Sequence, residues 1–172
     1  MEKIGFTIGK FAPFHKGHEY LIETALKQTD KVYVIVNDAQ EINTPIETRA
    51  KWIKDQYPQV EIIYGYHPPK QYGMDDKSVA IQIEYLKELT KGIHPTHFFS
   101  SEPYGAKVSE YMQVEDCRVD PQRKNVPISA TMIRQDLEKN KKYINEEVYQ
   151  EIKDQFQKKK GEQEWKEKQK LS

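Results

Sequence analysis

The chain has 172 residues, of which 37% are hydrophobic, so it is long enough for one domain of ordinary size with a buried core. Lys+Arg and Asp+Glu each number 27, so global charge gives no reason to expect a nucleic acid or a membrane as partner. Cys117 is the one cysteine, which excludes an internal disulfide and favours a reducing, cytoplasmic setting. The sequence opens with a strand-like pattern in place of a signal peptide, and no apolar run approaches the roughly 20 residues of a membrane span.

The first half of the chain alternates strand and helix patterns. Residues 3–9 are apolar and rich in strand-forming types, and residues 18–27 place their apolar side chains on one helical face. Residues 31–37 form a nearly continuous apolar run, which is typical of a strand covered on both sides. Residues 44–57 predict a helix with Thr44 as its cap and a proline at its first position.

The alternation continues through the second half. Strands are expected at 60–66 and 96–101, with a short last strand at 117–120, and helices at 78–92 and 104–112. This order predicts an α/β fold, a Rossmann-like parallel sheet of five strands with helices on both faces. Sheets of this kind bind ligands beyond the carboxyl ends of their strands.

The last part of the chain differs in composition. Val148, Ile152 and Phe156 are spaced by four, so this segment can dock as a helix, whereas the residues after it are charged and mixed in sign. We therefore expect a single domain over residues 1–143 and a helical, charged tail over residues 144–172.

The string "GKFAPFHKGH" follows the first predicted strand. Gly9 lets the backbone come close to a ligand, and His15 and His18 fall in the loop and at the start of the next helix. A helix N-terminus carries partial positive charge and unpaired N–H groups, which suit a phosphate. A zinc site fits poorly because no third ligand is evident nearby, so no metal site is expected in the protein itself.

This string resembles the signature of the nucleotidyltransferase superfamily, which shares a His-x-Gly-His element with class I aminoacyl-tRNA synthetases. Downstream, "ISATMIR" (128–134) is similar to that superfamily's second signature, of the form Ile-Ser-x-Thr-x-Ile-Arg. "FFSSEPYG" (98–105) and "RVDPQRKNVPIS" (118–129) resemble the nicotinamide mononucleotide (NMN) adenylyltransferases of bifunctional adenylyltransferase/ribosylnicotinamide kinases. The likeness covers about residues 3–137.

The resemblance implies transfer of AMP from ATP to NMN, which forms NAD and releases pyrophosphate, with Mg²⁺ accompanying ATP. The partners are then ATP and a phosphorylated small molecule, and the oligomeric state, a homo-oligomer included, is left open. The catalytic residues implied are His15, His18, Lys10 and Arg134. The residues implied for ATP are Gly9, Phe11, Gly17, Ser129 and Thr131, with Ser129 also predicted to cap a helix. Those implied for the acceptor are Arg49 and Tyr104.

The acceptor site is where the resemblance weakens. The NMN enzymes place a tryptophan near positions 73–80 to stack on the nicotinamide ring, and this stretch has no aromatic residue. Tyr72, Tyr104 and Trp52 are the candidate substitutes. Arg49 is as well explained by a solvated helix position as by a contact with phosphate.

Two further basic residues lie in the loop before the second signature. Arg123 and Lys124 are both candidates for the phosphates, and a solvated position is the better explanation for Lys124.

Other readings of the sequence stay open. The acceptor can be nicotinate mononucleotide, the nucleotide can be CTP, or the protein can be a nucleotide sensor without turnover. A truncated aminoacyl-tRNA synthetase is disfavoured, because the lysine-rich second signature of that class is absent. A fused kinase is not expected in these 172 residues either, since no Gly-x-x-x-x-Gly-Lys-Ser/Thr loop occurs in them.

Overall fold

The sheet is parallel throughout and has five strands, as predicted, and the structure gives their order as β3-β2-β1-β4-β5. The computed structural model describes residues 1–39, 42–70 and 73–171. The strands are β1 (Ile4–Gly9), β2 (Lys31–Asn37), β3 (Glu61–Gly65), β4 (His97–Ser100) and β5 (Glu115–Arg118). The order reverses between β1 and β4, so the carboxyl ends of these two neighbouring strands border the crevice in which open α/β sheets bind ligands.

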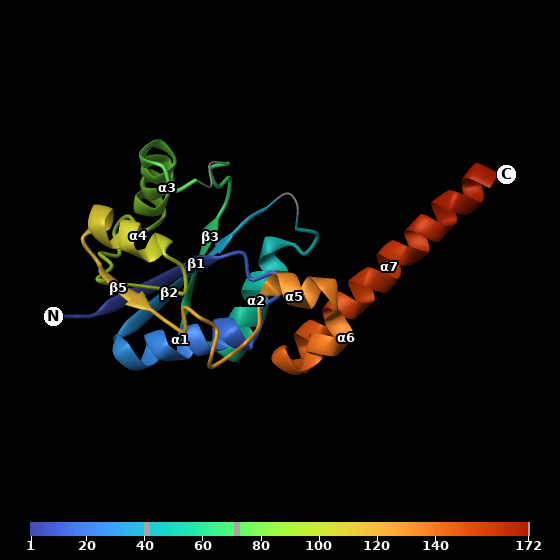
Figure 1. The fold of residues 1–172 in the computed structure, drawn as a ribbon, viewed down its shortest axis with the longest axis horizontal. Helices are drawn as coiled ribbons and strands as arrows, with labels where there is room; N and C mark the ends of the chain where they lie inside the picture. The colour runs from blue at the N-terminus through green and yellow to red at the C-terminus, as the bar shows by residue number, and fades with distance from the viewer. Residues whose placement is uncertain (40–41, 71–72, 172) are drawn as a thin grey trace.

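Helices cover both faces of the sheet, so the fold has three layers (Figure 1). The helices are α1 (Lys16–Gln28), α2 (Ile46–Gln56), α3 (Asp76–Leu89), α4 (Tyr104–Met112), α5 (Ala130–Gln135), α6 (Leu137–Asn140), the 3₁₀ turn η1 (Lys141–Tyr143) and α7 (Glu146–Leu171). One apolar core packs α1, α2, α5 and the start of α7 against the sheet. A second core packs α3 and α4 against the opposite face, where the rings of Phe6 and Phe98 meet edge to face at 4.8 Å.

The predicted element types are confirmed, and the differences lie at the ends. Thr44 does not cap α2, because its hydroxyl donates to Gln155 Oε1 at 3.0 Å and Pro45 holds the cap position instead. Helix α3 begins earlier than expected, since the Asp75 side chain accepts the amide of Ser78 and so supplies the cap. Strand β5 lies two residues earlier than expected, in register with β4.

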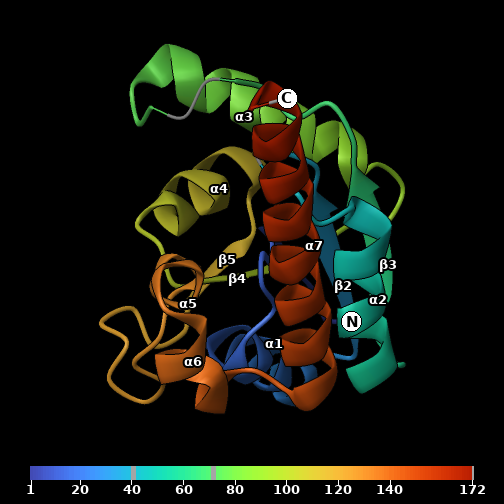
Figure 2. The same ribbon diagram turned by 90° about the vertical axis from the view of Figure 1, so that its right-hand side faces the viewer.

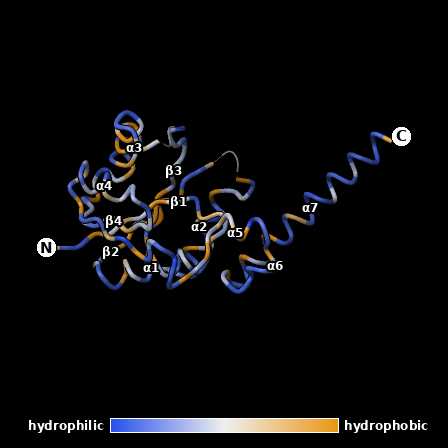
Figure 3. The backbone as a smooth tube through the Cα atoms, viewed as in Figure 1, coloured by the Kyte–Doolittle hydropathy of each residue, from blue (hydrophilic) through white to orange (hydrophobic). Residues whose placement is uncertain are grey.

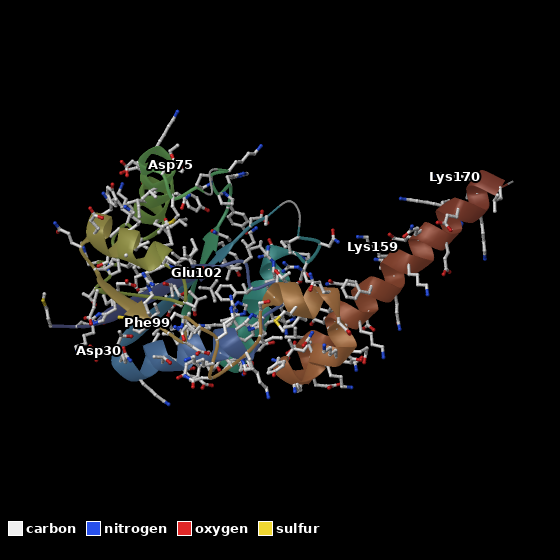
Figure 4. All side chains as sticks on the ribbon, in the orientation of Figure 1. Asp30, Asp75, Phe99, Glu102, Lys159 and Lys170 are labelled. Carbon is white, nitrogen blue, oxygen red and sulfur yellow. The ribbon has the colours of Figure 1, made fainter. Side chains whose placement is uncertain are left out.

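The last helix leaves the body of the molecule. Val148 and Ile152 of α7 are buried in the first core, whereas Phe156, the third residue of the predicted stripe, is 47% exposed. Beyond that point α7 projects away from the fold, and its surface is hydrophilic (Figures 1 and 3). Lys159 and Lys170, labelled in Figure 4, lie on this projecting part.

Among the described residues, every helix is too short or too polar to cross a lipid bilayer.

Candidate active site

A cavity of about 290 Å³ opens at the carboxyl ends of β1, β4 and β5. Its wall comes from four parts of the chain that are far apart in sequence: the end of β1, the start of α1, the loop after β4 and the segment between β5 and α5. The lining residues include Gly9, Phe11, His15, Gly17, His18, Glu102, Asp120, Arg123, Ser129 and Thr131. The two sequence motifs, more than 100 residues apart, therefore meet at one cavity at the switch point of the sheet.

His15 and His18 build the start of α1 with their own rings. Nδ1 of His15, the N-cap residue, accepts the amides of Gly17 and His18 at 3.0 and 3.4 Å, and Nδ1 of His18 accepts the amide of His15 at 3.2 Å. This is a capping box in which imidazoles take the places of hydroxyl and carboxylate. Because Nδ1 is an acceptor in both rings, each neutral imidazole carries its proton on Nε2 and can donate from there.

Packing holds both rings in place. They stack on each other with centroids 3.6 Å apart, and the Phe14 ring lies parallel to that of His18 at 5.9 Å. Burial and the nearby Arg123 charge lower the pKa of His15 to about 4. Burial, His15 and Arg123 together lower the pKa of His18 well below its usual range. Both imidazoles are therefore neutral donors near pH 7.

The far wall of the cavity is set by the loop that follows β5. The carboxylate of Asp120 accepts the amides of Lys124, Asn125 and Val126 at 2.8 to 3.0 Å, and these bonds lower its pKa. Within this loop Arg123 donates to the carbonyl of Ile128 at 2.6 Å and faces Glu102 at 4.0 Å. Arg123 thus lies at the cavity, whereas Lys124 is not among its lining residues.

The first residues of the second motif line the cavity. Ser129 caps α5 by accepting the amide of Met132 at 3.2 Å, as predicted, and Ala130 and Thr131 follow it along the wall. Arg134, predicted to be catalytic, is not among the residues that line this cavity, although it contacts Thr131, which does. Its guanidinium donates to the carbonyl of Ala12 at 2.6 Å and to the Thr131 hydroxyl at 3.3 Å, and it borders a smaller cavity beside α7.

A second cavity, of about 130 Å³, lies between the ends of β1 and β2 and the helices α3 and α4. Lys10 and Tyr104 line it, together with Ile8, Asn37, Asp38, Pro68, Pro69, Gln82, Tyr85 and Leu86. Burial raises the pKa of Tyr104 to about 12, so its phenol is neutral at physiological pH. Sequence reasoning missed Asp38 and Tyr85. Asp38 directly follows the end of β2, and that position is the signal that could have found it.

Arg49 is fully buried, so the solvated alternative for this residue is wrong. Its Nε donates to the carbonyl of Thr44 at 3.0 Å, and its Nη1 donates to the carbonyls of Lys10 and Asn37 at 2.6 and 2.7 Å. The guanidinium therefore ties the ends of β1 and β2 to the start of α2. It lines neither of the two cavities and lies behind the second one.

The candidate substitutes for the missing tryptophan lie in different parts of the structure. Trp52 is buried in the first core and donates from Nε1 to Glu151 at 2.9 Å, so it cannot stack on an acceptor. Tyr72 lies outside the described residues. Tyr104 lines the second cavity, as Tyr85 does.

The part of the chain that the structure describes contains no group of three or more His, Cys, Asp or Glu side chains arranged to bind a metal ion.

Comparisons with known proteins agree with this architecture. The family model of the citrate lyase ligase C-terminal domain matches residues 5–88. The trifunctional NAD biosynthesis/regulator protein NadR of Salmonella typhimurium is 29% identical over 166 residues, which cover 86% of this chain and 40% of NadR. The chain thus spans 40% of the length of that relative.

Solved structures give the same picture. A NadR protein in complex with NAD and AMP-PNP has a TM-score of 0.62 at 21% identity, over 84% of this chain and 45% of that one. A bifunctional NMN adenylyltransferase/ADP ribose pyrophosphatase from Francisella tularensis, complexed with AMP and a manganese ion, has a TM-score of 0.60 at 22% identity, over 84% and 44%. The chain has the nucleotidyltransferase fold. Within that fold it resembles the NMN adenylyltransferase domain of NadR.

Proposed function

We propose that the protein transfers AMP from ATP to NMN, forming NAD and pyrophosphate. The observation that carries this proposal is the meeting of His15 and His18 with Ser129 and Thr131 at one cavity. Four kinds of group there suit a polyphosphate: two imidazole donors, two hydroxyls, the start of α1 and the Arg123 guanidinium. The similarity to NadR and to an NMN adenylyltransferase supports the choice of acceptor.

The reaction needs no nucleophile from the protein, because the acceptor carries its own. A phosphate oxygen of NMN attacks the α-phosphorus of ATP, a new P–O bond forms, and the bond from the α-phosphorus to the bridging oxygen breaks, so its electron pair leaves with pyrophosphate. The protein positions the two anions and offsets the negative charge that develops. His15 and His18 would donate from Nε2 to the phosphoryl oxygens in that state.

Magnesium would enter this reaction as part of the MgATP substrate. The phosphates of ATP and water molecules would be its ligands there. Its chemistry would be to neutralise charge on the phosphates, and the steps assigned to His15, His18 and Arg123 do not depend on a protein-bound metal.

The acceptor would lie in the second cavity. Lys10 follows β1 directly and lines the second cavity, and its ammonium suits the acceptor phosphate. Tyr85 and Tyr104 offer aromatic surface for the nicotinamide ring in place of the missing tryptophan. Arg134 and Arg49 would have to move to reach the phosphates in the roles that the resemblance implies, because Arg134 donates to the carbonyl of Ala12 and Arg49 is buried behind the wall of the second cavity.

The direct test is formation of NAD and pyrophosphate by purified protein with ATP, Mg²⁺ and NMN. We expect both products in equal amounts. Nicotinate mononucleotide and CTP, tried in place of NMN and ATP, distinguish the neighbouring specificities. Pyrophosphate release with another phosphorylated acceptor and no NAD at millimolar NMN would show the acceptor to be wrong. Binding of ATP without pyrophosphate release from any acceptor would favour a sensor.

A further inference from the structure

The second cavity has a charge pattern that bears on which acceptor it takes. Of its described lining residues, Lys10 and Asp38 carry charge, and the rest are apolar, amide or phenolic. Burial raises the pKa of Tyr85 and of Tyr104 to about 12, so both phenols are neutral near pH 7. One cation and one anion therefore line this cavity, and the guanidinium of Arg49 lies behind its wall beside Asp38.

The two charges have a fixed order along the sheet. Lys10 follows β1, the strand whose end also borders the first cavity, and Asp38 follows β2, the next strand outward. Neighbouring strands lie about 4.8 Å apart. An acceptor that turns its phosphate toward Lys10 and the first cavity therefore places its other end on the side of Asp38.

Asp38 is held in position by its surroundings. Its backbone amide donates to the carbonyl of Gly65 at 2.9 Å, and its Oδ1 accepts the amide of Ala39 at 3.0 Å. Oδ1 also lies 3.7 Å from Nη2 of the buried Arg49. The side chain is nevertheless 47% exposed, so the carboxylate is fixed at its base and open to the cavity.

We propose that Asp38 is a specificity residue, which makes this cavity accept a nucleotide with a neutral or positively charged base and reject one whose base carries a carboxylate. This inference rests on the proposed function and names the acceptor class within it. NMN has a cationic pyridinium ring and a carboxamide that donates hydrogen bonds to a carboxylate. Nicotinate mononucleotide replaces that amide with a second anion, which Asp38 repels. A site that excludes a competitor by like charge gains specificity without added contacts to its own substrate.

The test compares NMN and nicotinate mononucleotide as acceptors for the wild type, for Asp38→Asn and for the control Glu47→Gln. Glu47 is an exposed carboxylate on α2 that lines neither cavity, and like Asp38 it lies in the field of Arg49. The measured quantity is the ratio of kcat/KM for the two acceptors, which does not depend on how much of a variant is folded. We expect the wild type to favour NMN by about tenfold or more, and Asp38→Asn to reduce that preference at least about fivefold. Glu47→Gln should keep it.

Equilibrium binding of the two mononucleotides by calorimetry separates this inference from the proposed function. If neither compound is turned over but NMN binds better and Asp38→Asn removes the difference, the reaction assignment fails and the charge selection stands. An unchanged ratio in Asp38→Asn, or a wild type that favours nicotinate mononucleotide, overturns the inference while the reaction stands. Binding of neither compound overturns both.

Discussion

At the scale of single residues, the imidazoles of His15 and His18 serve two purposes with opposite edges of the ring. Nδ1 completes the cap of α1, and Nε2 keeps the proton. The same contacts that start the helix therefore fix the tautomer that a phosphate needs. A substitution at either position disturbs both, so tests of catalysis need a variant that keeps the cap.

His18→Gln is such a variant, because glutamine at the third helical position can return the hydrogen bond of a capping box. We expect kcat to fall about 100- to 1,000-fold, as for the loss of one donor to a transition state, while the Kd for ATP changes little. Single-turnover kinetics measure the chemical step, and thermal unfolding checks the helix start. His18→Ala should show the same loss of kcat with lower stability. An unchanged chemical step in both variants would reject the role.

The lowered pKa of His15 also predicts how stability depends on pH. Its pKa is about 4 in the folded state and about 6.5 in an unfolded chain, so between these values the unfolded state binds more protons. Stability is then complete above pH 6.5 and declines as the pH falls toward 4, by up to about 3 kcal/mol for this one group. Urea unfolding at pH 7, 5.5 and 4.5 measures this. His15→Asn, which keeps a good N-cap and does not titrate, should lose less over the same range. Parallel curves for the two proteins would contradict the prediction.

Arg49 shows how a buried charge can organise backbone. Replacing it by methionine leaves the carbonyls of Lys10, Asn37 and Thr44 without donors. We expect Arg49→Met to lower the free energy of unfolding by about 3 kcal/mol or more. Lys51→Met is the matched control, because Lys51 lies on the same helix, is 60% exposed and makes only surface ion pairs, which contribute less than about 1 kcal/mol. Equal losses in the two variants would show that the buried bonds do not matter.

At the scale of elements, the sequence predicted each strand and each main helix, because hydrophobic periodicity is a local signal. The exact ends of the helices and strands were harder to predict. Thr44 has the residue type of a cap, yet its hydroxyl bonds Gln155, which lies 111 positions away in sequence. The position of Asp38 beside Tyr85 is equally non-local, since the two come from different elements and no spacing relates them. The cap at Ser129 was predicted because a helix cap depends on the local chain, and His15 was selected from a contiguous motif, whereas the catalytic role of His15 stays a prediction.

The loop after β5 offers a test at this scale. Asp120 accepts three of its amides, so Asp120→Ala should speed hydrogen exchange at Lys124, Asn125 and Val126 several-fold and weaken ATP binding through the freed Arg123. The control is Asp136→Ala. Asp136 accepts the amide of Lys139 at the start of α6, away from the cavity. Exchange that stays slow in Asp120→Ala would show that the loop is held by other contacts.

At the scale of the whole molecule, α7 joins the body by its first turns and then leaves it (Figure 1); in Figure 2, which is viewed from that side, it lies in front of the rest of the fold. Val148, Tyr149 and Ile152 are buried, and residues from 157 to 171 are exposed throughout. The division into residues 1–143 and 144–172 therefore stays a prediction, which truncation can test.

A chain that ends at Lys158 should unfold within a few degrees of the full chain, because nothing buried is removed. A chain that ends at Ile144 should lose about 4 kcal/mol or more, since three apolar side chains then leave the core. Circular dichroism during heating measures both. Equal stability of the two truncated chains would support an independent tail. A large loss of stability in the chain that ends at Lys158 would show that the projecting part of α7 contributes to the fold.

Among the described residues, Ile8 is the single side chain that lines both cavities. The end of β1 thus separates the two cavities, which under the proposed function hold the nucleotide on one side and the acceptor on the other. The acceptor side is built largely from α3, α4 and the loops after β2 and β3, none of which carries a motif residue of the first cavity. Substitutions in the second cavity can therefore change which phosphorylated molecule it binds without moving the residues that line the first cavity. The fold thus places the proposed reaction site and the proposed acceptor site in two cavities that can change independently.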